Sequence, residues 1–174
     1  MRASQRVHKL AAPYGKPPSP STLPPGEKTH GISGRELTAV NPIVVIPARL
    51  ASTRLPNKPL ADIAGKPMIV HMLERGLEAD IGPVAVACGD AAIADAVRAA
   101  GGTAVLTDPT LPSGSDRVHA ALGALDPHRK HDVVVNLQGD FPTLEAEQLR
   151  LTIAPLADPG IDIGTLVVPI HDES

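Results

Sequence analysis

Short apolar runs alternate with amphipathic stretches along residues 43–174, and this alternation constrains the fold most strongly. The apolar runs span residues 43–47, 84–88, 103–106, 132–137 and 164–168, and the stretches with helical spacing span residues 67–78, 91–100, 115–125 and 143–153. Strands that are buried on both faces read as continuous apolar runs, and a helix between two such strands forms a parallel crossover. We therefore predict an α/β fold, a Rossmann-like sandwich with a mostly parallel sheet.

The core of this sheet has to be built from aliphatic side chains. Phe141 and Tyr14 are the only residues of the Phe, Tyr and Trp class in a chain that is 43% hydrophobic. Cys88 is the only cysteine, which excludes an internal disulfide. Because Cys88 lies inside an apolar run, we expect it to be a small buried hydrophobic residue rather than a nucleophile.

Residues 1–40 differ in composition from the rest of the chain. They contain six prolines between positions 13 and 25, and proline is excluded from helix interiors and central strands. We predict a disordered Pro-rich extension over residues 1–40 and one domain over residues 41–174. The extension also lacks the uninterrupted apolar centre of a signal peptide.

Charge is spread unevenly between these two parts. The net charge of the chain is −3, and residues 1–40 carry six Lys and Arg against two Glu, so residues 41–174 carry a net charge of −7. An acidic body argues against a nucleic-acid partner. No apolar stretch approaches the roughly 20 residues of a membrane helix. We expect no membrane partner and a cytoplasmic location.

A cationic loop follows the first apolar run. No acidic residue lies between Ile43 and Ala61. The cations of the loop are Arg49, Arg54 and Lys58, and its hydroxyl residues are Ser52 and Thr53. Guanidinium groups bind phosphate oxygens in pairs, a lysine supplies a mobile charge, and ligands bind beyond the carboxyl ends of parallel strands. These features favour a triphosphate site over a solvated loop that pairs with surface acids.

A carboxylate follows the fourth apolar run, which ends in Gln138, Gly139 and Asp140. Magnesium is usually held by one or two carboxylates together with substrate phosphates. We predict that Asp140 faces the cationic loop and binds Mg²⁺, that Gln138 reads a base or ribose edge, and that Gly139 lets the backbone approach a ligand. An ordinary Gly-Asp turn is the alternative, and the cationic loop favours the site.

The segment from Ser113 to Arg117 directly precedes a predicted helix and has two interpretations. Backbone N–H groups at the start of a helix favour anions. Alternatively, the segment is a capped helix start with an internal ion pair between Asp116 and Arg117. The sequence does not favour either interpretation.

Several segments resemble the 3-deoxy-manno-octulosonate cytidylyltransferase (CMP-KDO synthetase) family. The similar segments are IPARLASTRLPNKPL at residues 46–60, GKPMIVH at 65–71, SGSDR at 113–117, VNLQGD at 135–140 and VPIH at 168–171. They occur in the order and at the spacing of the family. Together they are far more specific than any single motif.

The resemblance implies a nucleotidyl transfer from CTP to an acidic 2-keto sugar, with Mg²⁺ as cofactor. The 2-hydroxyl of the octulosonate would attack the α-phosphorus, and pyrophosphate would leave, which activates the sugar for lipopolysaccharide synthesis. The implied triphosphate ligands are Arg49, Ser52, Arg54 and Lys58, the implied cytidine-pocket residues are Ser113, Arg117 and Gln138, and the implied metal ligand is Asp140. Arg49, Lys58 and Asp140 would act catalytically, by positioning and electrostatics.

The chain also departs from the family pattern. Phe141 stands where the family usually has Glu, and residues 86–90, which end in Asp90, replace a usual Ala-Thr-Asp. The family continues past residue 174 with the sugar-binding region, a dimer-forming segment and a second metal carboxylate. We therefore expect a C-terminally truncated member of a homodimeric family, without turnover of its own. The alternatives are a cytidylyltransferase for another acidic sugar, such as a sialic acid, and an inactive nucleotide-binding fragment.

Overall fold

The computed structural model describes residues 40–51, 55–158 and 160–167. The predicted extension up to residue 39, Ser52, Thr53, Arg54 and the segment 168–174 lie outside the described residues. Residues 40–150 form one compact unit, which contains the whole sheet, and the described residues from Leu151 onward belong to a second unit. No helix in the described residues is long and apolar enough to cross a membrane.

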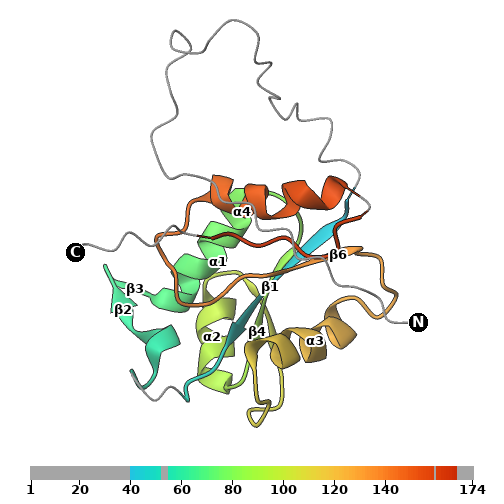
Figure 1. The fold of residues 1–174 in the computed structure, drawn as a ribbon. Helices are drawn as coiled ribbons and strands as arrows, with labels where there is room; N and C mark the ends of the chain where they lie inside the picture. Colours follow the sequence, from blue (N-terminus) through green and yellow to red (C-terminus); the bar gives the residue numbers. More distant parts are fainter. Residues whose placement is uncertain (1–39, 52–54, 159, 168–174) are drawn as a thin grey trace, which may run out of the picture. The chain divides into compact units, whose positions relative to one another are not determined.

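Four parallel strands form the central sheet, in the order β5-β4-β1-β6 (Figure 1). The strands are β1 (Pro42–Ala48), β4 (Val84–Cys88), β5 (Thr103–Leu106) and β6 (Val133–Asn136). β1 pairs with β4 in the register Val44 to Val84 and with β6 in the register Pro42 to Val133. Every residue of β4 is buried, as expected for a strand between two covered faces. The predicted α/β class with a parallel sheet is confirmed.

Helices follow the strands close to the predicted positions. They are α1 (Met68–Ala79), α2 (Ala91–Ala99), α3 (Gly114–Leu125) and α4 (Ala146–Ile153), with the 3-10 helices η2 (Lys58–Leu60) and η3 (Ala154–Ala157). Pro67 is the residue before α1 rather than its first residue, because it pairs in a small antiparallel ribbon of β2 (Asp62–Ile63) and β3 (Lys66–Pro67). The apolar pattern of the sequence does not predict this ribbon.

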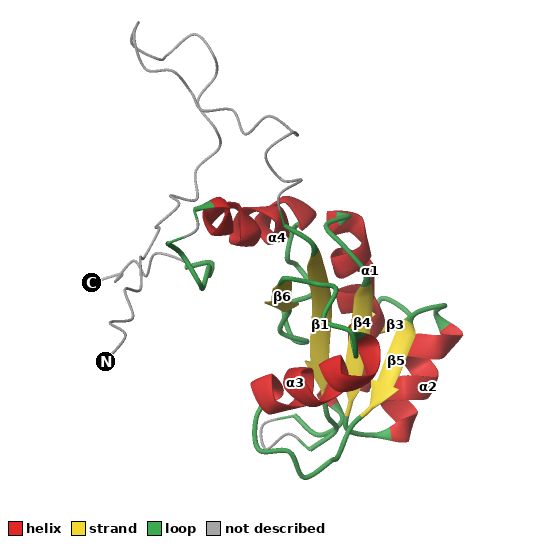
Figure 2. Cartoon of the chain, turned by 90° about the vertical axis from the view of Figure 1, so that its right-hand side faces the viewer, coloured by secondary structure: helices red, strands yellow, loops and turns green. Residues whose placement is uncertain are grey.

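The helices cover the two faces of the sheet unequally. α1 and α2 lie on one face and α3 lies on the other (Figures 1 and 2). On the α3 face, Ile43, Val45 and Ala87 pack with Val118 and Ala121. The core on the opposite face is aliphatic, with Val44, Ile46, Val86, Ile69, Met72, Leu73, Ile93 and Val97 at 2% exposure or less. The absence of aromatic residues from this set agrees with the composition.

Two predictions about apolar runs are wrong. β6 was expected to be buried on both faces, but Val134 is 44% exposed. Val134 is the register partner of buried Ile43, so it lies beyond the edge of the surface that α3 covers. Residues 164–167 form no strand, because a strand needs a ladder partner and none of these residues pairs with one in the described chain.

Candidate functional site

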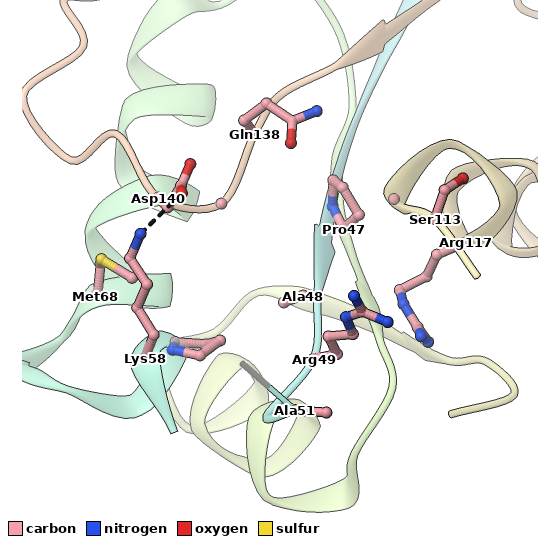
Figure 3. Close-up of a pocket in the computed structure, with 13 residues that line it drawn as sticks. Pro47, Ala48, Arg49, Ala51, Lys58, Met68, Ser113, Arg117, Gln138 and Asp140 are labelled. Carbon is pink, nitrogen blue, oxygen red and sulfur yellow. Dashed lines mark hydrogen bonds and ion pairs between the residues drawn. The ribbon is translucent and has the colours of Figure 1, made fainter. Parts of the chain in front are cut away.

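A pocket lies at the point of the sheet where the strand order reverses, next to β1. After β1 the chain adds β4 and then β5 on one side, and β6 joins the other side of β1. The loops after β1 and β6 therefore diverge, and open parallel sheets bind their ligands at such a point. Residues 47–49 and Ala51, at the end of β1 and in its loop, and residues 138–140, after β6, line a pocket of about 380 Å³ (Figure 3).

Most of the predicted site residues meet in this pocket. Its lining includes Arg49, Lys58, Ser113, Arg117, Gln138 and Asp140. Ser52 and Arg54 lie outside the described residues. The pocket also contains residues that the sequence motifs did not single out, namely Pro47, Ala48, Ala51, Pro59, Met68 and Gly114. They add apolar and backbone surface, and only their place inside the family-like segments could have drawn attention to them.

Lys58 and Asp140 form an ion pair across the pocket. The Lys58 Nζ donates to Asp140 Oδ2 at 2.8 Å, and the side chains are 35% and 57% exposed. Lys58, the last cation of the cationic loop, is the first residue of η2, and Asp140 follows β6. The prediction that Asp140 faces the cationic loop is thus confirmed for Lys58. An ion pair this exposed is worth about 1 kcal/mol or less, so a ligand can separate it at low cost.

Arg49 supplies a cation without a partner. Its side chain is exposed and lines the pocket, and it makes no hydrogen bond or ion pair within the described residues. In the view of Figure 3, Arg49 and Arg117 lie on one side of the pocket, and Lys58 and Asp140 lie on the other. Cations on both sides and a single carboxylate suit a ligand that carries several negative charges.

The start of α3 reaches the pocket through Ser113 and Gly114. Ser113 caps the helix, because its Oγ accepts from the Asp116 backbone N–H at 3.1 Å and donates to Asp116 Oδ2 at 2.6 Å. The capped-helix interpretation is confirmed in this respect. The ion pair that this interpretation predicts between Asp116 and Arg117 is wrong, because Arg117 does not bond to Asp116 in the part of the chain described. Anion binding at this helix start stays a prediction.

Arg117 is a buried arginine that makes three hydrogen bonds to its surroundings. Only 1% of its surface is exposed. Its Nη1 donates to Thr107 Oγ1 at 2.5 Å and to the Asp108 carbonyl at 3.1 Å, and its Nη2 donates to the Pro109 carbonyl at 3.4 Å. These bonds tie α3 to the loop after β5. Arg117 therefore forms part of the pocket wall, held in place by three of its five N–H donors.

Two glycines allow close packing beneath the pocket. A Cβ on Gly89 would lie 2.9 Å from Arg117 Nη1, so the guanidinium occupies the space of the missing side chain. A Cβ on Gly139 would lie 3.0 Å from the Pro47 carbonyl oxygen. Gly139 therefore lets its backbone lie close to β1, and because Gly139 also lines the pocket, the close approach to a ligand stays a prediction. The neighbouring Gln138 is exposed in the pocket, and its amide donates to Asn136 Oδ1 at 3.2 Å.

Cys88, at the end of β4, takes no part in this chemistry. Its side chain is fully buried, and burial raises the pKa of the thiol to about 11. The thiolate is the reactive form of cysteine. The expectation of a buried small hydrophobic residue is therefore confirmed.

The described residues contain no group of three or more His, Cys, Asp and Glu side chains placed to hold a metal ion. Among the described residues that line the pocket, Asp140 is the one with a carboxylate. A single exposed carboxylate among cations fits a magnesium ion that takes its other ligands from substrate phosphates and water. The donor set is thus compatible with Mg²⁺ in the presence of a nucleotide.

Comparison with known families decides the identity of the fold. The family model described as cytidylyltransferase matches residues 43–174. The chain belongs to the cytidylyltransferase family. The pocket and all of the sheet except Pro42 fall inside the matched range.

Individual cytidylyltransferases narrow the resemblance further. The chain is 65% identical over 130 residues to the 3-deoxy-manno-octulosonate cytidylyltransferase of Rhodospirillum centenum, which covers 75% of this chain and 51% of that protein. It is 55% identical over 137 residues to the enzyme of the same name from Paramagnetospirillum magneticum, with 79% and 56% coverage. The chain thus spans about half the length of these relatives.

A solved structure agrees with the sequence relatives. CMP:2-keto-3-deoxy-manno-octonic acid synthetase complexed with CTP superposes with a TM-score of 0.63 at 40% identity, over 68% of this chain and 48% of that chain. A cytidylyltransferase from Leptospira borgpetersenii superposes with a TM-score of 0.56 at 25% identity, over 70% and 51%. The resemblance to the octulosonate cytidylyltransferases is confirmed by both kinds of comparison.

Proposed function

We propose that this chain binds CTP in the pocket between the ends of β1 and β6, as the nucleotide site of a 3-deoxy-manno-octulosonate cytidylyltransferase. One observation carries the proposal. Residues that belong to three separate family-like segments, Arg49 and Lys58, Ser113, and Asp140, line a single pocket at the switch point of the sheet. The 65% identity to an enzyme of this name supports the choice of substrate.

The cations of the pocket would hold the triphosphate. Arg49 has an unused guanidinium that can bind two phosphate oxygens, and Lys58 can exchange Asp140 for a phosphate. Ser52 and Arg54 would add to this set. Ser113 and Gln138 would border the nucleoside part, while Arg117 would shape the wall behind it.

The reaction needs positioning and charge stabilisation more than covalent chemistry. The 2-hydroxyl oxygen of the sugar would form a bond to the α-phosphorus of CTP and lose its proton to solvent. The bond from that phosphorus to the bridging oxygen of the β-phosphate would break, and pyrophosphate would leave with the electron pair. Arg49 and Lys58 would stabilise the negative charge that develops on the leaving group. Magnesium held between Asp140 and the phosphates would supply further charge neutralisation.

Calorimetry with CTP, UTP and CMP tests the binding step directly. We expect CTP to bind more tightly than CMP, because the cations contact the β- and γ-phosphates, and more tightly than UTP if Gln138 and Ser113 border the base. An equal affinity for CTP and CMP would contradict the triphosphate site. Pyrophosphate release with octulosonate or with a sialic acid then distinguishes the two sugar substrates, and binding without release in either assay identifies a fragment that only binds nucleotide.

A further inference from the structure

Asp90 occupies the residue before α2 but does not cap that helix. The residue at this position normally accepts from the first turn of its own helix, yet the Asp90 side chain makes no such bond. Its Oδ2 instead accepts from the backbone N–H of Leu50 at 2.8 Å, at a partly buried position. A carboxylate from the loop after β4 thus binds the backbone of the loop after β1.

The bond to Leu50 completes a clamp around Arg49. The Gly89 N–H donates to the Ala48 carbonyl at 2.8 Å, one residue before Arg49, and Asp90 binds the N–H one residue after it. Ala48 and Cys88 are the last register pair of β1 and β4. The two bonds therefore hold the backbone on both sides of Arg49 beyond the end of the ladder, while the Arg49 side chain stays without a partner in the described residues.

The sign of the Asp90 charge is wrong for direct binding of a polyanion. The loop from Ile43 to Ala61 has no acid of its own, and Asp90 places a carboxylate against its backbone. A negative charge near bound phosphates is unfavourable. Any gain in nucleotide affinity from Asp90 must therefore come from geometry. A fixed backbone keeps the Arg49 guanidinium in its binding position and lowers the entropy cost of ordering it on binding.

We propose that Asp90 is a positioning residue that orients Arg49 for the phosphates of the nucleotide. This inference rests on the proposed function and deepens it. Its role depends on an oxygen that accepts a hydrogen bond and not on the negative charge. Asn can supply that oxygen and Ala cannot, so the two substitutions separate the possibilities.

The test is calorimetry with CTP and with cytidine on the wild type, Asp90→Ala, Asp90→Asn, Arg49→Ala and the Arg49→Ala/Asp90→Ala double variant. We expect Asp90→Ala to weaken CTP about tenfold, part of the loss that a charged hydrogen bond can cause, and to leave cytidine unchanged. Asp90→Asn should recover most of the affinity. In the Arg49→Ala background, the Asp90→Ala change should have no further effect on CTP affinity, because the guanidinium that Asp90 would position is absent.

Several outcomes would overturn the inference. They are additive losses from the Asp90 and Arg49 changes, an equal loss of cytidine affinity in Asp90→Ala, and an Asp90→Asn variant as weak as Asp90→Ala. If Arg49→Ala weakens CTP but Asp90→Ala does not, only this inference fails. If CTP does not bind the wild type, the proposed function fails with it. Hydrogen exchange of the Leu50 amide gives a second measurement, and unchanged protection in Asp90→Ala would also refute the clamp.

Discussion

The Nζ of Lys58 lies 2.8 Å from Oδ2 of Asp140, although 82 positions separate the two residues in the chain. One residue follows the loop after β1 and the other follows β6, so the ion pair bridges the switch point of the sheet. Both partners are partly exposed. Under the proposed function, a phosphate would replace Asp140 as the partner of Lys58, and Asp140 would hold magnesium. The ion pair would then keep both side chains near their binding positions in the absence of ligand.

The Asp140→Asn change should remove the dependence of CTP binding on magnesium. An amide oxygen is a weaker ligand for Mg²⁺ than a carboxylate, and the loss of the ion pair leaves Lys58 free for phosphate. Calorimetric titration of CTP with and without Mg²⁺ measures the difference. Asp95→Asn is the control, because Asp95 is an exposed residue of α2 that pairs with Arg98 outside the pocket. A wild-type response to magnesium in Asp140→Asn would make Asp140 a turn residue only.

Removal of the charge of Arg49 or of Lys58 should weaken the binding of CTP. We expect Arg49→Ala and Lys58→Ala to lose roughly 1.5–3 kcal/mol of binding free energy, the range for hydrogen bonds to charged groups. The Arg49 loss should be the larger one, because the Arg49 side chain has no partner among the described residues to give up before it binds, while Lys58 leaves Asp140. Calorimetry gives both values.

The matched control for these variants is Arg75→Ala. Arg75 pairs with Glu78 on α1 and does not line the pocket. The same change of net charge should therefore leave CTP affinity nearly unchanged. If Arg75→Ala weakens CTP as much as Arg49→Ala does, the effect comes from the overall charge of the protein and not from a phosphate site.

Features that depend on local pattern could be predicted from the sequence. Continuous apolar runs identify β1 and β4, because strands that are buried on both faces need such runs. The site could be located because polar residues follow strand ends, and the ends of parallel strands lie on one edge of the sheet. The same rule predicts that Arg49, Lys58 and Asp140 lie together at that edge, and all three line the pocket.

Features that depend on tertiary contacts could not be predicted in the same way. β6 has the sequence VVVN, which reads like a central strand, and its exposure follows only from the limited reach of α3. Nothing local to Asp90 indicates that it binds Leu50 instead of its own helix. The β2–β3 ribbon is too short for a periodic signal in the sequence. Its tight turn is seen only in the structure, where Ala64 and Gly65 have positive φ.

Alkaline pH should destabilise the fold through Cys88. Burial raises the pKa of this thiol to about 11. The folded state therefore disfavours the thiolate, so this contribution to stability is complete below the unfolded pKa near 9 and is lost as pH rises toward 11. Between about pH 8 and about pH 10.5 the loss should be about 2 kcal/mol of unfolding free energy.

Urea unfolding of the wild type and Cys88→Ala at both pH values isolates this effect. Cys88→Ala should be less stable at the lower pH, because it leaves a small cavity in β4. Its stability should then fall less as the pH is raised, since other titrating groups are common to both proteins. Parallel loss of stability in the two proteins would show that the thiol does not ionise on unfolding in this range.

Gly89 and Gly123 should respond to alanine in opposite directions. A Cβ on Gly89 would lie 2.9 Å from Nη1 and 3.1 Å from Cζ of Arg117. The guanidinium would have to move, and its bonds to Thr107 and to the Asp108 carbonyl would lengthen. Overpacking of this kind costs roughly 1–3 kcal/mol. A lower midpoint of thermal unfolding in Gly89→Ala is therefore expected.

Gly123 lies within α3, and apart from its chain neighbours and the backbone of its own helix, no atom of the described residues lies within 4 Å of the position that its Cβ would take. Alanine is favoured over glycine in a helix by roughly 0.5–1 kcal/mol, so Gly123→Ala should raise the midpoint. Both substitutions add one methyl group to the same compact unit, and only the space around that group differs. If Gly89→Ala is as stable as Gly123→Ala, the guanidinium of Arg117 is free to move aside. Arg117 would then not be the fixed wall of the pocket that its three hydrogen bonds indicate.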